Sequence, residues 1–218
     1  MASYKGCSPL FAKCKSNEFT DSKNVSVTPK QIGKLIDITI KPNYKEAALY
    51  ADDDIAEQIK EFDSADITLG VDEMDLDAFT EMFGHTSQNV KNLADGKIIT
   101  EKGDTPANFG AHGHIYAISK NNVTTFVACM LHRVKFEQPE EKVTTKGESI
   151  TFNTPSITGK AYKDEDGSWR TRVFNIKTLA EAKTILNKLV TRAESTLIAT
   201  SSVDGDNAIN ADEQEATE

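Results

Sequence analysis

The sequence has few of the residues on which several common protein classes depend. Only three of its 218 residues are cysteines and only one is a tryptophan. Cys7, Cys14 and Cys129 show no Cys-x-x-Cys spacing, and residues 1–30 carry no export signal, so we expect reduced thiols rather than a disulfide framework. The longest purely apolar run, 126–131, is far shorter than the ~20 residues of a membrane-spanning helix. We therefore expect a soluble protein that binds no membrane.

The sequence also lacks the short motifs that mark common catalytic sites. It contains no Gly-x-Ser-x-Gly elbow, no Gly-Lys-Ser/Thr phosphate loop and no His-Glu-x-x-His zinc motif. No nucleophile is paired with a base at a recognisable spacing. We expect no enzymatic activity and no cofactor, and a hydrolase with two glycosidase carboxylates stays open as a third-ranked alternative.

Two patterns that could indicate a metal site fall short of one. His112 and His114 lie two apart on an expected strand, so both could reach one ion, but no third ligand stands at a defined spacing. We expect them to be surface or partly buried histidines. A calcium loop opening with the three aspartates at 52–54 would need glycine where Glu57 stands and glutamate where Asp63 stands. The sequence therefore predicts no metal site.

Negative charge is concentrated in two parts of the chain. The net charge is −9 at pH 7, and from Asp52 to Glu81 twelve carboxylates stand against the single cation Lys60. Such a block repels polyanions and membrane surfaces. Residues 194–218 hold seven acids, no bases and little apolar surface, so we expect an acidic flexible tail.

Basic residues are too sparse to form a stripe that would bind nucleic acid in a sequence-specific way. The four that come closest are Arg133, Lys135, Arg170 and Arg172.

The middle of the chain has the alternation of β-strands. Residues 34–41 and 66–71 alternate apolar and polar positions, so each should cover a core with one face. Residues 109–119 and 123–136 are joined by Lys120-Asn121-Asn122, which favours a tight turn. The second of these strands is apolar on both faces between Phe126 and Leu131, as expected of a central strand.

A further hairpin is indicated near the end of the chain. Residues 157–162 and 169–174 both read as strands, and Asp166-Gly167 lies between them. Asp-Gly between two alternating segments is a strong local signal for a two-stranded hairpin.

Two amphipathic helices follow from their caps and spacing. Asp75 can cap a helix over 76–83 that ends before Gly84. Its expected apolar stripe is Leu76, Phe79 and Phe83. Thr178 and Glu181 form a capping box for a second helix, which should extend to about residue 191. The expected fold is mostly β (α+β): an antiparallel β-sandwich or open barrel flanked by one short and one longer α-helix.

Several short motifs follow one another in a characteristic order. They are Leu49-Tyr50-Ala51-Asp52, Ile67-Thr68-Leu69-Gly70-Val71 leading into Asp75-Leu76-Asp77, Phe83-Gly84, Pro106-Ala107-Asn108-Phe109-Gly110, the strand 126–131, and Lys135-Phe136. In this order the chain resembles the major tail proteins that form the tail tube of long-tailed siphophages of Gram-positive hosts. The resemblance covers roughly residues 1–190 and rests on the order of the motifs, since none is specific alone.

The resemblance implies a structural virion protein that self-assembles into hexameric rings, stacked as a non-contractile phage tail tube. DNA would pass through it without sequence-specific binding. The partners would be other copies of the chain, tail completion proteins and the tape measure protein. The tube would be assembled in the host cytoplasm, and contractile tails and secretion tubes remain related alternatives. A shared inner barrel of about 24 strands would leave a bore of roughly 35 to 40 Å, which one DNA duplex fits.

The resemblance also assigns roles along the chain. Residues 1–30 would form an N-terminal arm that reaches a neighbouring subunit or packs on its own domain. Residues 31–193 would form the tail-tube domain with an extended loop at about 42–63, followed by the tail 194–218. Ring-stacking contacts would come from Tyr50, Asp52, Asp53, Asp54 and Ile55. Candidates to face the lumen are Asp37, Thr39, Lys41, Thr68 and Asp72.

Two alternatives stay open at this point. The segment 42–63 could be an ordinary exposed hairpin without an assembly role. The whole chain could be a β-sandwich carbohydrate- or receptor-binding module of a virion or cell surface. Such a module would be expected to expose clustered aromatic side chains. Aromatics make up 7% of the chain and Trp169 is the only tryptophan, so no such cluster is evident in the sequence.

Overall fold

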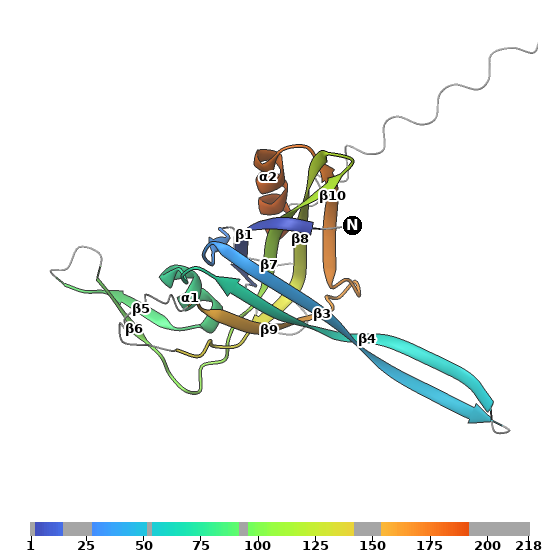
Figure 1. Cartoon of the computed structure of the whole chain (residues 1–218). Coiled ribbons are helices and arrows are strands. Elements are labelled where there is room, and N and C mark those ends of the chain that lie inside the picture. The colour runs from blue at the N-terminus through green and yellow to red at the C-terminus, as the bar shows by residue number, and fades with distance from the viewer. Residues whose placement is uncertain (1–2, 15–27, 52–53, 92–95, 142–153, 192–218) are drawn as a thin grey trace, which may run out of the picture.

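Antiparallel strands make up most of the fold. The computed structural model describes residues 3–14, 28–51, 54–91, 96–141 and 154–191 (Figure 1). Every strand pairing among these residues is antiparallel, and two helices pack against the strands. The predicted mostly-β class with one short and one longer helix is confirmed. Neither described helix is long and apolar enough to cross a bilayer.

Eight strands form one bent sheet, and two further strands form a small separate sheet. The eight are β1 (Ser3–Lys13), β2 (Lys30–Gln31), β3 (Leu35–Ala51), β4 (Asp54–Val71), β7 (Phe109–Lys120), β8 (Val123–Phe136), β9 (Ser156–Tyr162) and β10 (Arg170–Ile176). Their order is β2-β1-β7-β8-β9-β4-β3, with β10 also paired to β8. The small sheet is the hairpin of β5 (Thr86–Asn89) and β6 (Lys97–Thr100).

The central strand β8 pairs with one strand on one edge and with two in succession on the other. β7 follows it along its whole length. On the opposite edge, β10 pairs with residues 126–131 and β9 with residues 133–136. Because β10 and β9 diverge there, the sheet divides into two parts that run in different directions (Figure 1).

The prediction of a hairpin around Asp166-Gly167 is wrong. β9 and β10 do not pair with each other; both run antiparallel to β8 in the same direction along its edge. The tight turn is present, with Gly167 donating to the Asp164 carbonyl. It lies in a loop at residues 163–169 that interrupts this edge instead of reversing the chain. Pairing with β8 gives the backbone N–H and C=O groups of β9 and β10 the hydrogen bonds that they would otherwise have formed with each other in a hairpin.

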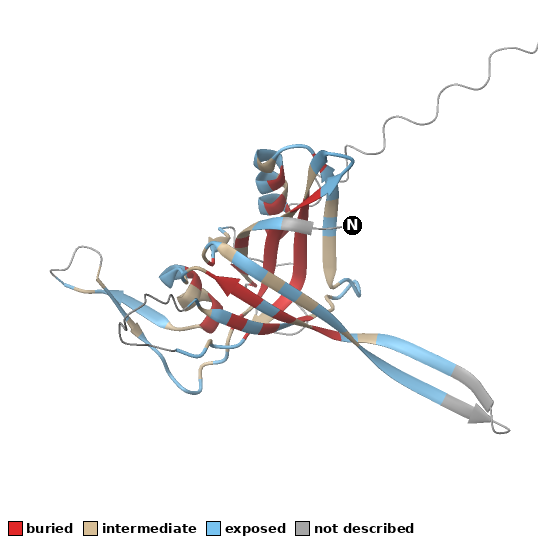
Figure 2. Cartoon of the chain, in the orientation of Figure 1, coloured by how far each residue is buried: buried red, intermediate tan, exposed pale blue. Residues whose placement is uncertain are grey.

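The hairpin of β7 and β8 agrees with its prediction. Asn121 and Asn122 have φ of 51° and 62°, the left-handed conformation that a two-residue hairpin turn requires. Residues 127–132 of β8 are all buried, as expected for a central strand. The pattern of burial is visible in Figure 2, where the red parts of β7 and β8 lie inside the molecule.

Helix α1 (Leu76–Phe83) begins and ends at its predicted caps. The Asp75 carboxylate accepts hydrogen bonds from the N–H groups of Asp77 and Ala78, each at 3.0 Å. Gly84 follows the helix with a left-handed φ of 69°. Local sequence signals alone were sufficient here, because both caps act within a few residues of the helix end.

The buried side of α1 differs in part from the expected stripe. The buried residues are Ala78, Met82 and Phe83, whereas Leu76 is 50% exposed. The helix packs against β1, β2 and β8, and these contacts turn Ala78 and Met82 inward.

Helix α2 (Leu179–Val190) packs across β7 and β8 on the part of the sheet that carries β10. Thr178 accepts a hydrogen bond from the Glu181 N–H, as the capping box predicts. Leu186 and Val190 lie over Gly113, where an added Cβ would come within 2.8 Å and 2.5 Å of their side chains. The absence of a side chain at Gly113 therefore lets the helix approach the sheet.

The described part of the predicted N-terminal arm belongs to the sheet of its own chain. β1 pairs with β7 from Ser3 to Lys13, and Phe11 is fully buried. Of the two roles left open for this segment, these residues pack on their own domain. The predicted acidic tail, 194–218, lies outside the described residues.

Replacing Gly113 with valine should test the docking of α2. The new side chain overlaps Leu186 and Val190, so we expect the free energy of unfolding to fall by about 1–3 kcal/mol. Urea unfolding followed by circular dichroism measures this. Gly103→Ala is the control, because an added Cβ there meets no atom within 4 Å. Equal stability of the two variants would contradict the close helix–sheet contact.

Candidate assembly surface

The far part of the β3–β4 hairpin projects beyond the rest of the molecule (Figure 1). β9 pairs with β4 only between Ala65 and Gly70. Beyond this point, as far as the structure describes the chain, β3 and β4 pair only with each other, from Tyr44 opposite Phe62 to Ala51 opposite Asp54. We call residues 44–62 the arm. The segment expected as an extended loop is therefore a regular two-stranded ladder for most of its length.

The arm has no interior of its own. Every described arm side chain from residue 44 to 48 and from 58 to 61 is exposed, and Figure 2 shows this near part of the arm in pale blue. Tyr44 and Ile59 are 49% and 54% exposed. A lone two-stranded hairpin is marginally stable in water, and its free edges invite pairing with other chains. The arm thus has the physical character of a contact surface for a partner.

The predicted ring-stacking residues fall at the far end of the arm. Tyr50 is opposite Ile55 in the ladder, and Asp54 is opposite Ala51. Asp52 and Asp53 lie outside the described residues.

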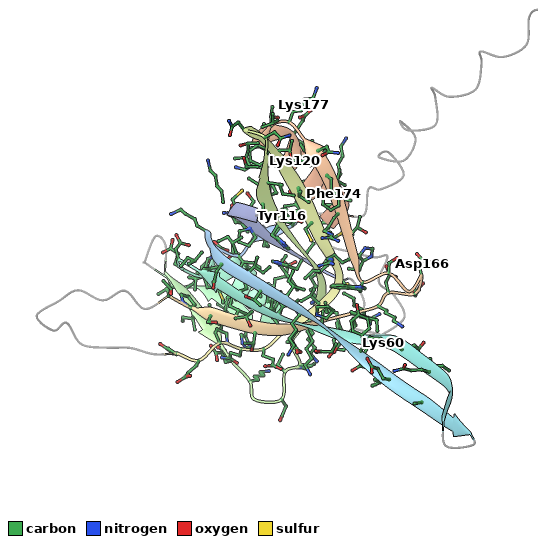
Figure 3. The ribbon with its side chains drawn as sticks, turned by 45° about the vertical axis from the view of Figure 1, so that its right-hand side comes forward. Lys60, Tyr116, Lys120, Asp166, Phe174 and Lys177 are labelled. Carbon is green, nitrogen blue, oxygen red and sulfur yellow. The ribbon has the colours of Figure 1, made fainter. Side chains whose placement is uncertain are left out.

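Cross-strand ion pairs support the near half of the arm. Lys60 is paired with Glu46, and the Lys45 Nζ lies 2.6 Å from an Asp63 carboxylate oxygen. Hydrogen bonds to these carboxylates raise the pKa of both lysines. All four side chains are solvent-exposed, so each pair contributes little to stability. Lys60 also lies over the Tyr44 ring, 5.2 Å from its centroid. Figure 3 shows Lys60 on the arm.

An aromatic stack fixes the base of the arm to the loop between β9 and β10. The Tyr44 and Phe62 rings meet edge to face at 6.0 Å. Phe62 stacks on Trp169, with centroids 4.8 Å apart and planes 17° apart. The Arg170 guanidinium covers the Trp169 ring at 4.3 Å. The direction in which the arm leaves the body is therefore set by contacts with a loop more than one hundred residues away in sequence.

The loop that carries Trp169 is itself held by His132 of β8. The His132 Nδ1 lies 2.6 Å from the Asp164 carboxylate, and the two side chains are each 5% exposed. The same carboxylate, through its other oxygen, accepts hydrogen bonds from the N–H groups of Asp166 and Ser168. The His132 backbone N–H donates to the Trp169 carbonyl. Figure 3 places Asp166 at the outer end of this loop.

His132 also contacts a hydroxyl, which completes an acid–histidine–hydroxyl arrangement that sequence reasoning missed. Its Nε2 lies 2.6 Å from the Thr171 Oγ1. The spacing resembles a nucleophile–base–acid triad. However, the Asp164 carboxylate also organises the loop backbone, and the near-complete burial of Asp164 and His132 leaves a substrate little access to them. The three residues come from separate elements, so no sequence spacing could have signalled the contact.

Four of the five candidate lumen residues lie on one exposed face of the sheet. Asp37, Thr39 and Lys41 alternate along β3, and Thr68 is opposite Thr39 on β4; all four are exposed. The face continues onto β9, where Thr158 is opposite Thr68. We call this the polar face; its members are Asp37, Thr39, Lys41, Thr68, Ser156, Thr158 and Lys160.

Asp72, the fifth candidate, has a different environment. It follows the end of β4 and accepts hydrogen bonds from the N–H groups of Lys34 and Glu73, at 2.7 Å and 2.8 Å. These hydrogen bonds, aided by the Lys34 ammonium 3.1 Å away, lower the pKa of the carboxyl. Asp72 thus joins the beginning of β3 to the end of β4.

The two histidines that could have been metal ligands are buried, which corrects the expectation of surface or partly buried residues. His112 is 0% and His114 2% exposed, and their rings stack 5.5 Å apart. Burial lowers the pKa of His112 to about 3 and that of His114 to about 4. Among the residues that the structure describes, no three His, Cys, Asp or Glu side chains are grouped as a metal site would require. The alternation along β7 places His112 and His114 on one face of the strand, but it does not say whether other elements cover that face. The sequence therefore could not decide whether the two histidines are buried.

No protein-family model matches the chain, and no curated protein matches it.

Trp169→Ala should loosen the base of the arm. Loss of the contacts with Phe62 and Arg170 should lower the free energy of unfolding by about 2 kcal/mol, since Trp169 is only half-buried. It should also speed amide hydrogen exchange in the arm. Leu76→Ala is the control, because Leu76 is a large apolar side chain that is 50% exposed and belongs to α1, which lies away from the arm (Figure 1). Unchanged exchange in the Trp169 variant would show that the stack does not hold the arm.

The buried histidine pair should make the fold sensitive to mild acid. His112 and His114 stay neutral in the folded chain, whereas both take up protons below about pH 6.5 once unfolded. As the pH falls from about 6.5 towards 4, each should reduce the free energy of unfolding by about 1.4 kcal/mol per pH unit. Urea unfolding at several pH values should give a shallower slope for His114→Gln. If the free energy of unfolding depends on pH equally in this variant and in the wild type, His114 is not held neutral in the folded chain.

Proposed function

We propose that this chain is a structural, non-catalytic virion protein that self-assembles into stacked hexameric rings. The rings form the tail tube of a long, non-contractile phage tail, assembled in the host cytoplasm, through which DNA passes. Partners are other copies of the chain, tail completion proteins and a tape measure protein. The order of sequence motifs suggests this function, and three features of the fold support it.

The projecting arm is the observation that carries the proposal. A 19-residue hairpin segment with exposed faces and two free edges gains little from its own chain. Contact with a neighbouring copy would cover Tyr44 and Ile59 and the free edges. In a stack of rings, an arm of this length can cross from one ring to the next.

Unpaired sheet edges support lateral association. β3 pairs only with β4, and β10 pairs only with β8, so each has one edge without a partner strand among the described residues. Edge strands that lack a partner favour the addition of a strand from another chain. Repetition of one such contact around a ring closes the wall.

The polar face is suited to the bore. It presents mainly hydroxyl groups, and its two cations, Lys41 and Lys160, both lie opposite Asp66 of β4. A surface with few unpaired cations makes few lasting contacts with DNA phosphates, so the polymer can slide.

Electron microscopy of the purified chain tests the proposal directly. We expect rings or tubes in negative stain, with a bore close to the diameter estimated for about 24 strands. In a shortened-arm variant, residues 46–60 are replaced by Asn-Gly, so that Lys45 and Glu61 remain opposite each other across a tight turn. This variant should remain folded, with a cooperative thermal unfolding transition followed by circular dichroism, but form no stacks.

The remaining outcomes are equally decisive. A wild-type chain that stays monomeric at high concentration would refute the function. Full-length tubes from the shortened-arm variant would refute the role of the arm in stacking.

A carbohydrate- or receptor-binding module is the second candidate, and one observation favours it. Tyr44, Phe62 and Trp169, which are far apart in sequence, form an aromatic cluster that the sequence did not reveal. Phe62 and Trp169 stack on each other and are only partly exposed. Tyr44 is 49% exposed with Lys60 over its ring, and so offers the most accessible ring of the three. Binding of glycans by a monomeric protein, lost in Tyr44→Ala, would favour this candidate over the tube.

A further inference from the structure

A groove of about 540 Å³ lies where β3 passes the part of the sheet that contains β1, β7, β8 and β10. One side is the beginning of β3, from Leu35 to Ile40. The other side includes Tyr116 of β7 and Phe174 of β10. Both residues are labelled in Figure 3, in the part of the molecule away from the arm. β3 and β10, which both have an edge unpaired among the described residues, therefore border the same groove.

The groove combines exposed apolar groups with positive charge. Ile36 and Phe174 are 55% and 46% exposed and line the same groove, and exposed apolar side chains that gather at a groove mark interaction sites. Lys5 and Arg172 contribute two cations, and Asp37, the acidic residue of the lining, has its carboxylate over Gly70 on the polar face. Arg172 lies 5.2 Å from the Phe174 ring centroid, so a cation and an aromatic ring are presented together.

A buried polar group also lines the groove. His114 is 2% exposed, and its Nδ1 makes no hydrogen bond with any described residue. A buried polar atom without a partner is costly, so a group entering the groove could satisfy it.

The arm has the complementary combination of groups. Residues 44–62 contain six carboxylates and two lysines, and both lysines are already paired with carboxylates. Ile59 is exposed and is two residues from the exposed Glu61, so both lie on one face of the ladder. An apolar side chain beside a carboxylate thus matches Phe174 beside Arg172.

We infer that the groove between β3 and β10 receives the arm of a second copy of this chain, with Ile59 against Ile36 and Phe174 and Glu61 against Arg172. The inference rests on the proposed self-assembly and assigns the acceptor surface for the arm. Donor and acceptor are different surfaces of one chain, so the contact is heterologous. Such a contact repeats from copy to copy instead of stopping at a dimer.

Charge reversal tests the contact. Arg172→Glu and Glu61→Arg, each alone, place like charges opposite one another and should raise the concentration needed for assembly about ten-fold. Both substitutions in one chain restore opposite charges, so assembly should return towards the wild-type level. Sedimentation velocity and negative-stain microscopy measure the assembled fraction. Both side chains are exposed, so folding should be kept, which circular dichroism checks.

Lys183→Glu is the matched control, since it makes the same charge change as Arg172→Glu at an exposed position on α2. It should leave assembly unchanged. If the wild type assembles and the single reversals have no effect, the groove is not the acceptor and the proposed function stands. Impaired single variants without recovery in the double variant also overturn the direct contact. Failure of the wild type to assemble refutes the proposed function and this inference together.

Discussion

The structure depends on the way β8 is paired along both edges. One edge belongs entirely to β7, while the other is shared in succession by β10 and β9. Both faces of the strand are covered, with α2 over one part and the cluster around α1 beside the other. The point where β10 gives way to β9 divides the sheet, and β9 then leads through β4 to β3. The arm projects because β4 continues past the last residue that β9 can pair.

This arrangement separates a stable body from an arm with almost no internal stabilisation. The body buries two apolar clusters, each closed by a helix. The arm has exposed ion pairs, which contribute little, and a stack at its base. That stack reaches β8 through Trp169 and the loop held by His132, so the direction of the arm is tied to the core. A defined direction with an exposed surface is what an assembly contact requires, because the partner then meets an already ordered element.

Polar groups inside the body hold parts of the fold in place. The Asp164–His132–Thr171 contact has the distances of a catalytic triad, yet it orders the loop that supports the arm. His112 and His114 lie in the interior as neutral rings, one of them beside the groove assigned to a second copy. The acidic arm and the cationic groove give a chain of net negative charge two surfaces of opposite sign. Assembly through them would be stronger at low ionic strength than at high.

The sequence by itself determined the elements whose signals are local. The caps of both helices, the Asn121-Asn122 turn and the buried centre of β8 were all predicted, because each depends on residues a few positions apart. It also placed four of the five candidate lumen residues on one exposed face, since period-two alternation defines the faces of a strand. Only the tertiary structure decided that Asp166-Gly167 does not reverse the chain, that residues 42–63 form a ladder and that the two histidines are buried. Those outcomes depend on which distant strand satisfies each backbone edge and which elements cover each face, and neither is encoded in local spacing.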